Sequence, residues 1–245
     1  MKPLISIIIP VFNHAHTLEF SLFSLYKQTY QSIEIVIVDD GSTDKFEETM
    51  REIMKKSWTQ NLSIKIIKQE NRGAAASRNR GLLESKGDYV IFWDADTIGK
   101  DQMLEKMFAA LESNPTASYA YSQYKFGWKK IKSQKFNVDD LLMSNYIDTT
   151  SLIRRAAVIP FDENIKRFQD WDLWLGMLDE GKVGVYVSEV LFRKIVRGRK
   201  GISSWLPSFF YRLPWKTRAV REYEKARQVI LKKHSIQEQT AARAK

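Results

Sequence analysis

The order of apolar and amphipathic segments predicts an α/β fold with a mostly parallel central sheet and helices on both faces. Short runs of branched apolar residues alternate with segments of helical spacing through the first hundred residues. The runs are too continuous for strands that leave one face in water, which indicates buried parallel strands. Polar residues gather directly after the runs at 5–10, 33–38 and 89–93. In a wound sheet these strand ends lie along one edge, where such folds bind ligands.

The first half of the chain reads as four strands with three helices between them. Leu18, Leu22 and Leu25 recur at intervals of four and three residues, which is helical spacing. Ser42 or Asp44 can cap the second helix, which ends near residue 56. The expected strands are 5–10, 33–38, 63–68 and 89–93, and the other expected helices are 17–28 and 74–83.

The second half contains shorter segments in a less regular order. They are a helix at 101–111 capped near 99–101, a strand at 117–124, a basic hairpin or loop at 125–137, a short helix at 139–144, a strand at 148–154, a helix at 170–178 and a strand at 183–191. There is no internal repeat and no low-complexity linker between the halves. We therefore expect both halves to pack on one sheet.

The run at 89–93 ends in Asp94-Ala95-Asp96, which is the stretch around which the chain is organised. Burying a carboxylate is costly, so both aspartates are expected at the carboxyl edge of the strand. Residues i and i+2 of an extended chain point the same way, so both can face one polyanionic ligand. Mg²⁺ or Mn²⁺ is the expected bridge, because one or two carboxylates and substrate phosphates suffice to hold it. The alternative is a polar loop after a strand.

Two further polar clusters are expected at the same edge. Phe12-Asn13 follows the first strand, and Asp39-Asp40 follows the second. A carboxylate there can accept from a base N–H or from ribose hydroxyls, although a turn and helix cap would explain the Gly-Ser-Thr-Asp run at 41–44 equally well. The absence of a Gly-x-Gly-x-x-Gly motif argues against a conventional dinucleotide site.

Composition and length exclude several classes of protein. The 245 residues are enough for one large α/β domain. The lack of cysteine rules out a disulfide framework or zinc–thiolate site, and it fits a reducing compartment. The N-terminal run lacks a signal-peptide cleavage region, and no apolar run approaches about 20 residues. We expect a cytoplasmic protein that is soluble or peripheral on the inner face of the membrane.

The net charge of +10 is concentrated in the last 53 residues. Residues 1–192 carry 24 basic and 26 acidic side chains, whereas residues 193–245 carry 15 and 3. There is no helix-turn-helix, zinc-finger or RNA-recognition signature, so nucleic acid is not the expected partner. The aromatic and basic spacing over 204–234 instead suits a helix on an anionic membrane surface. Alternatively, this helix packs on the rest of the chain or on a second subunit.

Six motifs, in this order, resemble the inverting glycosyltransferases of family 2, which have a GT-A fold. The resemblance covers about residues 4–192, and the number and order of the motifs make it specific. The motifs are Ile8-Ile9-Pro10-Val11-Phe12-Asn13, Val38-Asp39-Asp40-Gly41-Ser42-Thr43-Asp44, Asn71-Arg72-Gly73 with Ala76-Ser77-Arg78-Asn79-Arg80-Gly81, Asp94-Ala95-Asp96, Phe161-Asp162-Glu163, and Gln169-Asp170-Trp171-Asp172-Leu173-Trp174.

The resemblance implies roles for individual residues. Asp170 would be the general base, and Asp96 would ligate the metal, with Asp94 facing the ribose and able to join it. Arg197 and Arg199, in the basic region where the family's histidine is missing, are expected to help neutralise the donor diphosphate instead. The remaining substrate-binding residues are expected to be Pro10, Phe12, Asn13, Asp39, Asp40, Arg78 and Trp171. The donor half would span about 1–98 and the acceptor half about 99–203, followed by the tail at 204–245.

Two departures from the family pattern affect these roles. Gln169 stands where the family usually has Glu before the base. Many members also have a histidine after the last strand that can reach the metal, and here the region 193–200 is basic without one. From local sequence alone, a helix N-cap or a charge in the first turn of a helix is a slightly better explanation of Asp170, and the ordered set of motifs reverses that preference.

The implied activity is transfer of a sugar, with inversion, from a nucleotide-diphosphate sugar to an acceptor hydroxyl. A UDP-sugar is the expected donor, and a glycan or lipid-linked acceptor in envelope polysaccharide or glycolipid synthesis is the expected partner. A non-catalytic nucleotide-sugar-binding protein of the same fold is the first alternative. A sugar nucleotidyltransferase is the second, although the loop at 11–14 lacks the glycines and basic residues expected after its first strand.

Overall fold

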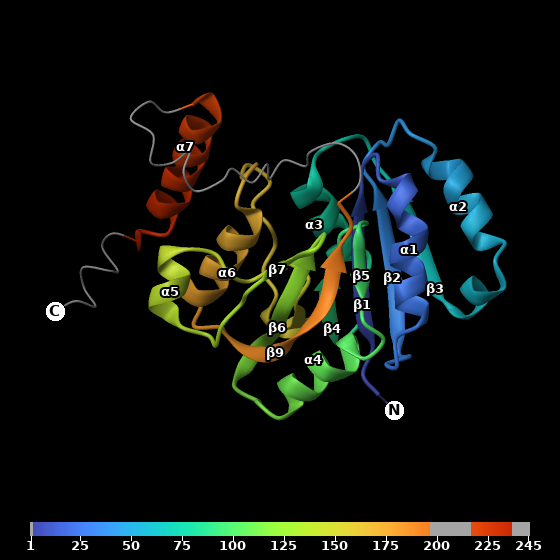
Figure 1. The fold of residues 1–245 in the computed structure, drawn as a ribbon, viewed down its shortest axis with the longest axis horizontal. Helices are drawn as coiled ribbons and strands as arrows, with labels where there is room; N and C mark the ends of the chain where they lie inside the picture. The colour runs from blue at the N-terminus through green and yellow to red at the C-terminus, as the bar shows by residue number, and fades with distance from the viewer. Residues whose placement is uncertain (1, 197–216, 237–245) are drawn as a thin grey trace.

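Four parallel strands form the first half of the sheet, as the apolar runs predict. The structure is a computed structural model that describes residues 2–196 and 217–236. Ile7 lies opposite Ile35 on one side and Ile91 on the other, which places the first strand in the middle of this half. The strands run in the order β3 (Ser63–Lys68), β2 (Ile33–Asp39), β1 (Ile5–Val11) and β4 (Tyr89–Phe92) (Figure 1).

Alternate residues of these strands enter two hydrophobic cores, one on each face of the sheet. On β1, Ile7 and Ile9 belong to the first core and Ile8 to the second. On β4, Ile91 packs in the first core and Phe92 in the second. This alternation confirms the predicted fold of a sheet covered on both faces. The first core is covered by α1 (Ala15–Tyr26), α2 (Phe46–Met54) and α4 (Met103–Glu112), and the second by helices that include α3 (Ala74–Glu84).

Strand β3 differs from the expectation that no strand of the sheet has a solvent-exposed face. It lies at the edge of the sheet, and each of its residues is either exposed or only partly buried. Lys65 and Lys68 on this strand form ion pairs with Glu84 and Glu47. Charged lysines on an edge strand discourage pairing with another chain. The position at the edge, which is a property of the whole sheet, therefore explains the difference.

The two expected helix caps are wrong. Helix α2 begins after Lys45 without a side-chain cap, and α4 begins after Gln102 in the same way. The Ser42 hydroxyl accepts from the backbone N–H of Asn13, and the Asp44 carboxylate accepts from that of Ala15. These side chains therefore join the first two strand-end loops instead of capping the helix that follows them.

Mostly antiparallel strands of the second half extend the same sheet beyond β4. Strand β8 (Leu152–Arg154) is shorter than expected, so residues 145–151 form a loop. Strand β5 (Thr97–Gly99) was not expected, and it pairs with the end of β9 (Val183–Lys194). The order from β4 is β8, β6 (Ala117–Phe126), β9 and β5, with β7 (Lys129–Ile131) paired to β6 as the expected hairpin. Strand β9 thus reaches three residues further than predicted, and it ends at Lys194.

Helix α7 (Arg218–Lys233) packs against the domain, which is one of the two alternatives for the basic helix (Figure 1). Ile230 and Leu231 enter the second core, together with α5 (Val138–Met143) and α6 (Gln169–Asp179). Its apolar face is therefore already buried. No helix among residues 2–196 and 217–236 is both long and apolar enough to cross a bilayer. The predicted aromatic segment at 205–215 lies outside the described residues.

Polar contacts fasten the end of α7 to α6. Lys233 pairs with Asp162 at 2.8 Å and with Asp172 at 2.9 Å. The ring of His234 lies between Asp172 and Asp179, at 2.9 and 2.6 Å. Burial alone would lower the pKa of His234, but hydrogen bonds to the two aspartates raise it. Several basic residues of the tail are thus used within the fold.

We predict that Gly81→Ala destabilises the protein, although alanine favours a helix by about 1 kcal/mol over glycine. A Cβ at Gly81 of α3 would lie 2.3 Å from Cγ2 of Ile8, a buried and stiff side chain of β1. Overpacking of this kind costs about 1–3 kcal/mol, so the clash outweighs the propensity. Urea denaturation should show a lower free energy of unfolding, whereas Leu83→Ala, at an exposed position of the same helix, should change it by less than about 0.5 kcal/mol. An unchanged or raised value for Gly81→Ala would contradict the close contact.

Candidate active site

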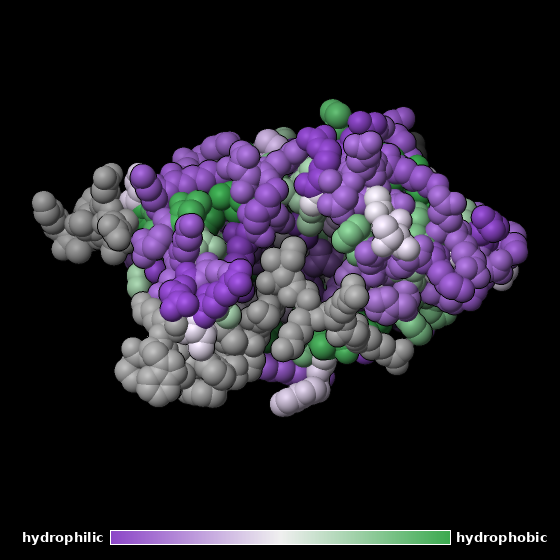
Figure 2. Space-filling view, turned by 90° about the horizontal axis from the view of Figure 1, so that it is seen from above, coloured by the Kyte–Doolittle hydropathy of each residue, from purple (hydrophilic) through white to green (hydrophobic). Residues whose placement is uncertain are grey.

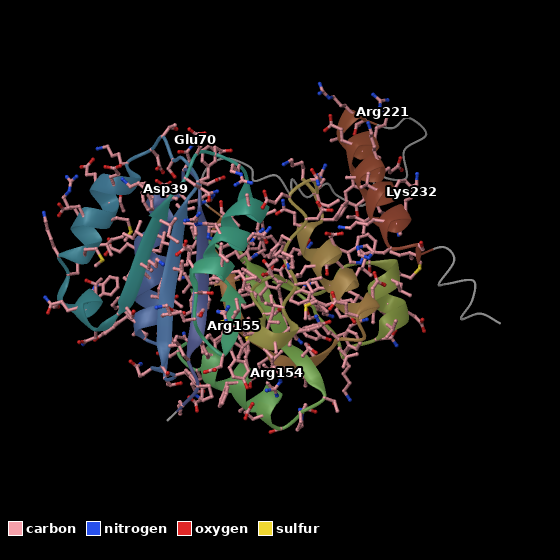
Figure 3. All side chains as sticks on the ribbon, turned by 180° about the vertical axis from the view of Figure 1, so that it is seen from behind. Asp39, Glu70, Arg154, Arg155, Arg221 and Lys232 are labelled. Carbon is pink, nitrogen blue, oxygen red and sulfur yellow. The ribbon has the colours of Figure 1, made fainter. Side chains whose placement is uncertain are left out.

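The motif residues meet at the carboxyl edge of the parallel strands. Figure 2 looks onto this end of the molecule and shows hydrophilic residues around a hollow near its middle. Asp39 ends β2 at this edge, whereas Arg154 and Arg155 lie toward the opposite one (Figure 3). Phe12 follows β1 here and is 45% exposed, and Pro10 is partly buried beside it. The edge thus carries an exposed aromatic ring beside a row of carboxylates.

The first two loops of the site are joined by Asn13. Its backbone has a positive φ of 57°, a conformation that asparagine tolerates better than most residues. Its side-chain oxygen accepts from the backbone N–H groups of Thr43 and Asp44 at 2.8 and 3.1 Å. Asn13 therefore holds the loop after β1 to the loop after β2. Because its side-chain oxygen is used in this way, the expected contact with substrate would have to come from the side-chain NH₂ group.

Asp39 and Asp40 are both buried, and both already accept hydrogen bonds from neighbouring loops. Asp39 accepts from the backbone N–H of Ser42 at 3.0 Å. Asp40 accepts from the backbone N–H groups of Arg72 and Gly73, at 2.9 and 2.8 Å, and from the Gln69 side chain. These contacts fix the loop at 70–73 against the end of β2. The expected nucleotide pocket would be bordered by this fixed loop.

A network of ion pairs lies at the centre of the site. Lys194 donates to Asp94 at 2.8 Å and to Asp148 at 2.7 Å, and all three side chains are at least partly buried. Arg78 donates to the other oxygen of Asp94 at 3.0 Å and to Gln169 at 2.9 Å. The network therefore connects the end of β4 to helix α3, to the end of β9 and to the start of α6.

Charges within this network shift the pKa values of its members. Burial alone would raise the pKa of Asp94, but Lys194 and Arg78 outweigh it and hold that pKa well below its usual range. Burial alone would lower the pKa of Lys194, but Asp148 and Asp94 raise it well above its ordinary value. Asp94 is therefore an ionised carboxylate with both oxygens engaged, and Lys194 is a permanent cation at neutral pH.

Asp96 is the carboxylate of the pair that retains a free oxygen. Its Oδ1 is buried and has no hydrogen-bond partner. Burial and the nearby charge of Asp94 raise the pKa of Asp96 to about 6. A buried carboxylate without a partner is costly, and a bound cation would remove that cost. This oxygen fits the expected Mg²⁺ or Mn²⁺ ligand, whereas Asp94 is already held by two side-chain cations.

The described part of the chain does not form a complete metal cage. Within it, no three His, Cys, Asp or Glu side chains are grouped so that they could hold a metal ion by themselves. Magnesium in nucleotide sites is commonly held by one or two carboxylates together with substrate phosphates. The arrangement around Asp96 therefore suits a cation that is completed by the donor diphosphate.

Asp170 lies in the first turn of α6 with its carboxylate oriented by two donors. Asn145 donates to one oxygen at 2.6 Å, and the backbone N–H of Trp171 donates to the other at 3.0 Å. Burial and the negative charge of Asp148 raise the pKa of Asp170 to about 6. A carboxylate with that pKa is ionised at neutral pH and more basic than an ordinary aspartate, which suits proton abstraction.

Other residues of the prediction lie elsewhere. Trp171 is 2% exposed, packs in the second core and donates through its indole N–H to the backbone oxygen of Leu141 at 2.7 Å. This placement gives it a structural contact and does not support direct contact with substrate. Arg197 and Arg199 lie outside the described residues. Their expected role with the diphosphate stays a prediction.

Four residues of the site were absent from the predicted set: Asn145, Asp148, Gln169 and Lys194. Gln169 had been noted only as a departure from the family pattern, and its amide oxygen keeps a contact with Arg78. Lys194 lies in the basic stretch after the last strand, so its charge was visible but its burial was not. Asp148 was expected in a strand, and Asn145 had no signal in the sequence.

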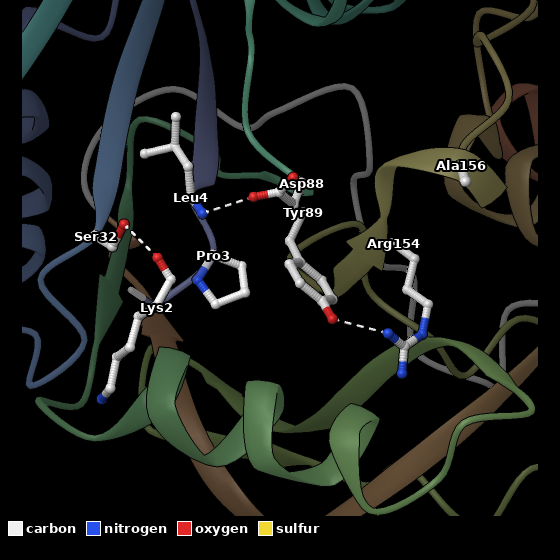
Figure 4. A pocket seen from close by; sticks show the side chains of 8 residues that line it. All are labelled: Lys2, Pro3, Leu4, Ser32, Asp88, Tyr89, Arg154 and Ala156. Atoms are coloured by element: carbon white, nitrogen blue, oxygen red, sulfur yellow. Dashed lines mark hydrogen bonds between the residues drawn. The ribbon is translucent and has the colours of Figure 1, made fainter.

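One cavity of the described residues is remote from this chemistry. It has a volume of about 710 Å³ and lies at the amino ends of β1 and β4, lined by Lys2, Tyr89 and Arg154 among others (Figure 4). The guanidinium of Arg154 is already used, since it donates to the backbone oxygens of Leu111 and Ala117 and to Tyr89. The convergence of motif residues, and not this cavity, therefore identifies the site.

Comparison with known proteins agrees with this geometry. The family model described as Glycosyl transferase family 2 matches residues 6–160. The chain is 33% identical over 211 residues to an uncharacterized glycosyltransferase of Haemophilus influenzae, covering 82% of each chain. It is 29% identical over 209 residues to the Escherichia coli UDP-Glc:alpha-D-GlcNAc-diphosphoundecaprenol beta-1,3-glucosyltransferase WfgD, covering 82% of this chain and 80% of that protein.

Solved structures share the fold at lower identity. Staphylococcus aureus TarS 1-349 in complex with UDP-GlcNAc superposes with a TM-score of 0.71 at 21% identity, covering 86% of this chain and 64% of that one. The mannosyltransferase PcManGT of Pyrobaculum calidifontis, in complex with GDP-Man and Mn²⁺, gives 0.62 at 18% identity, covering 81% and 59%. The chain thus spans less than two thirds of the length of these two structures. The resemblance and the GT-A fold expected from the sequence are confirmed, and the chain belongs to glycosyl transferase family 2.

Proposed function

We propose that the protein transfers a sugar, with inversion, from a nucleotide-diphosphate sugar to an acceptor hydroxyl. The observation that carries this proposal is the placement of Asp170 across one network from the Asp94–Asp96 pair. Arg78 contacts both Asp94 and Gln169, the residue before Asp170, so the donor edge and the base are held by one side chain. A base beside a diphosphate site is what direct displacement at the anomeric carbon requires.

Each charged residue has a distinct part in the proposed reaction. Asp170 accepts the proton of the acceptor hydroxyl as that oxygen attacks the anomeric carbon and the bond to the diphosphate breaks. Lys194 and Arg78 place positive charge where negative charge develops on the leaving diphosphate. Asp96 would hold a divalent cation, which supplies further Lewis-acid stabilisation of that leaving group. Attack from the side opposite the leaving group gives inversion.

The charge balance of the site supports a role for the cation. Four carboxylates, those of Asp94, Asp96, Asp148 and Asp170, surround the two cations Arg78 and Lys194. A donor diphosphate would add further negative charge to a site that already has an excess of it. A divalent cation on Asp96 compensates for this excess, so we propose that the donor binds together with Mg²⁺ or Mn²⁺.

We propose a UDP-sugar as donor and a lipid-linked acceptor, in polysaccharide or glycolipid synthesis. The E. coli relative is named for a UDP-Glc donor and a diphosphoundecaprenol acceptor, and TarS structures contain UDP or UDP-GlcNAc. Such an acceptor would place the protein on the inner face of the membrane. The sequence predicts that residues 204–234 attach the protein to the membrane. Because the apolar face of α7 is buried in the domain, we propose that α7 contributes to this attachment through its exposed basic residues.

Replacement of the base should separate catalysis from donor binding. We expect Asp170→Asn to lower kcat by about 10²–10⁴-fold, because the amide keeps the shape but cannot accept the proton. Steady-state transfer and nucleotide binding by calorimetry measure the two effects. Glu180→Gln, at the far end of α6, is the matched control and should leave both unchanged. Loss of nucleotide binding together with kcat would assign Asp170 a structural role.

The pH dependence of kcat/KM should follow the raised pKa of Asp170. Asp170 must be deprotonated to act as a base, so activity should fall about tenfold per unit below a pH of about 6. The profile should be measured with saturating Mg²⁺, which keeps Asp96 ionised. If Asp170 had the pKa of an ordinary aspartate, the fall in kcat/KM would begin only near pH 4. Activity that is flat down to pH 4.5 would show that another group accepts the proton.

Removal of the divalent cation and removal of the Asp96 carboxylate should both lower the rate of sugar transfer. Excess EDTA and Asp96→Ala should each reduce transfer by about 10²-fold or more, while thermal unfolding shows that the fold survives. Lys194→Gln serves as the comparison, because it should weaken donor binding even at saturating Mg²⁺. Full activity in excess EDTA would overturn the role of the cation without affecting that of Asp170.

A further inference from the structure

The hairpin of β6 and β7, residues 124–131, is not used by the proposed reaction although it borders the site. Gly127 begins the turn with a positive φ of 59°, and its backbone N–H donates to the backbone oxygen of Lys194 at 3.0 Å. Lys194 is the residue that bridges Asp94 and Asp148. The tip of the hairpin therefore projects from the catalytic edge, directly beyond the central ion network.

The tip exposes an apolar surface to solvent. Trp128 is 93% exposed, and Phe126 and Val196 are 44% and 57% exposed. A Cβ placed on Gly127 would lie 3.3 Å from a methyl group of Val196, so Val196 adjoins the turn. Three exposed apolar side chains around one turn form a cluster, whereas single exposed apolar residues are common on any protein.

Lysines surround this apolar tip. Residues 125–135 contain five lysines and no acidic residue. Lys125 and Lys130 lie directly opposite each other in the antiparallel pairing, so their side chains share one face. Like charges in this position destabilise a hairpin, and within residues 2–196 and 217–236 neither lysine has a carboxylate partner. An anionic partner would offset this repulsion.

We infer that the hairpin at 124–131 is a membrane-contact surface that rests on anionic lipid headgroups. Tryptophan is favoured at the boundary between headgroups and hydrocarbon, and adjacent lysines gain energy from anionic lipids. A neutral acceptor glycan could stack on Trp128, but it would leave the facing lysines without counter-charges. This inference rests on the proposed lipid-linked acceptor for its purpose, because contact here would hold the catalytic edge at the plane from which such an acceptor emerges.

Sedimentation with vesicles tests the inference without any turnover. The full chain should bind vesicles of phosphatidylcholine with 30% phosphatidylglycerol at low salt, and should bind pure phosphatidylcholine vesicles much less. Lys125→Gln/Lys130→Gln should weaken partitioning about thirty-fold, since each lysine near an anionic surface contributes about fivefold. Lys45→Gln/Lys55→Gln is the matched control, because it removes the same charge from the region of α2, at the other end of the sheet (Figure 1).

The tryptophan has its own variant and control. Trp128→Ala should weaken binding roughly tenfold if about 55 Å² of its apolar surface leaves water. Leu83→Ala, which removes another exposed apolar side chain, should not weaken it. Transfer to a short water-soluble acceptor should persist in all four variants, so failure of the membrane contact and failure of the proposed activity give different results.

Several outcomes would overturn the inference. If Lys125→Gln/Lys130→Gln and Lys45→Gln/Lys55→Gln weakened vesicle binding equally, only the total charge of the protein would matter. Unchanged binding of the hairpin variants would place the contact elsewhere, for example in the tail, and absence of wild-type binding would remove it altogether. Unchanged vesicle binding by Trp128→Ala, together with a raised KM for a soluble acceptor, would identify the hairpin as an acceptor-binding element instead.

Discussion

The burial of Lys194 between Asp94 and Asp148 is the constraint on which the site depends. A buried ammonium is strongly unfavourable unless carboxylates surround it, and loss of one partner leaves an uncompensated charge. The ion pairs therefore hold the end of β9 against the end of β4 and against the loop before β8. These segments are distant in sequence, and their meeting brings the carboxyl edge of the parallel strands and the second half of the chain into one site.

Arg78 extends this constraint to the proposed base. Its two terminal nitrogens contact Asp94 and Gln169, so α3 links the end of β4 to the first turn of α6. A glutamate in place of Gln169 would add a negative charge beside Asp170 and raise its pKa further. Glutamine preserves the hydrogen bond without that charge. Gln169 is therefore compatible with Asp170 as the proposed base, so this departure from the family pattern does not by itself favour the non-catalytic alternative.

The C-terminal helix contributes to the same region from outside. Lys233 and His234 contact Asp172, which lies in α6 two residues after Asp170, and Arg227 donates to the backbone oxygen of Met143 in α5. Some basic residues of α7 thus contact the domain, whereas others are exposed to solvent. A surplus of basic residues in sequence gives no indication of this division, because it depends on which side of the helix meets the domain.

The sequence alone determined the wound sheet, the motif positions and the family. Continuous apolar runs and polar strand ends are local features, and parallel winding brings such ends to one edge. The sequence could not show that Asp148 lies in a loop or that β9 continues to Lys194. Nor could it show that Ser42 and Asp44 bind a neighbouring loop instead of capping a helix. Those features depend on contacts between residues far apart in the chain. Only the tertiary structure decided that Lys194, one of several basic residues at the end of the last strand, would be buried among carboxylates, because burial and charge pairing arise when separate segments pack together.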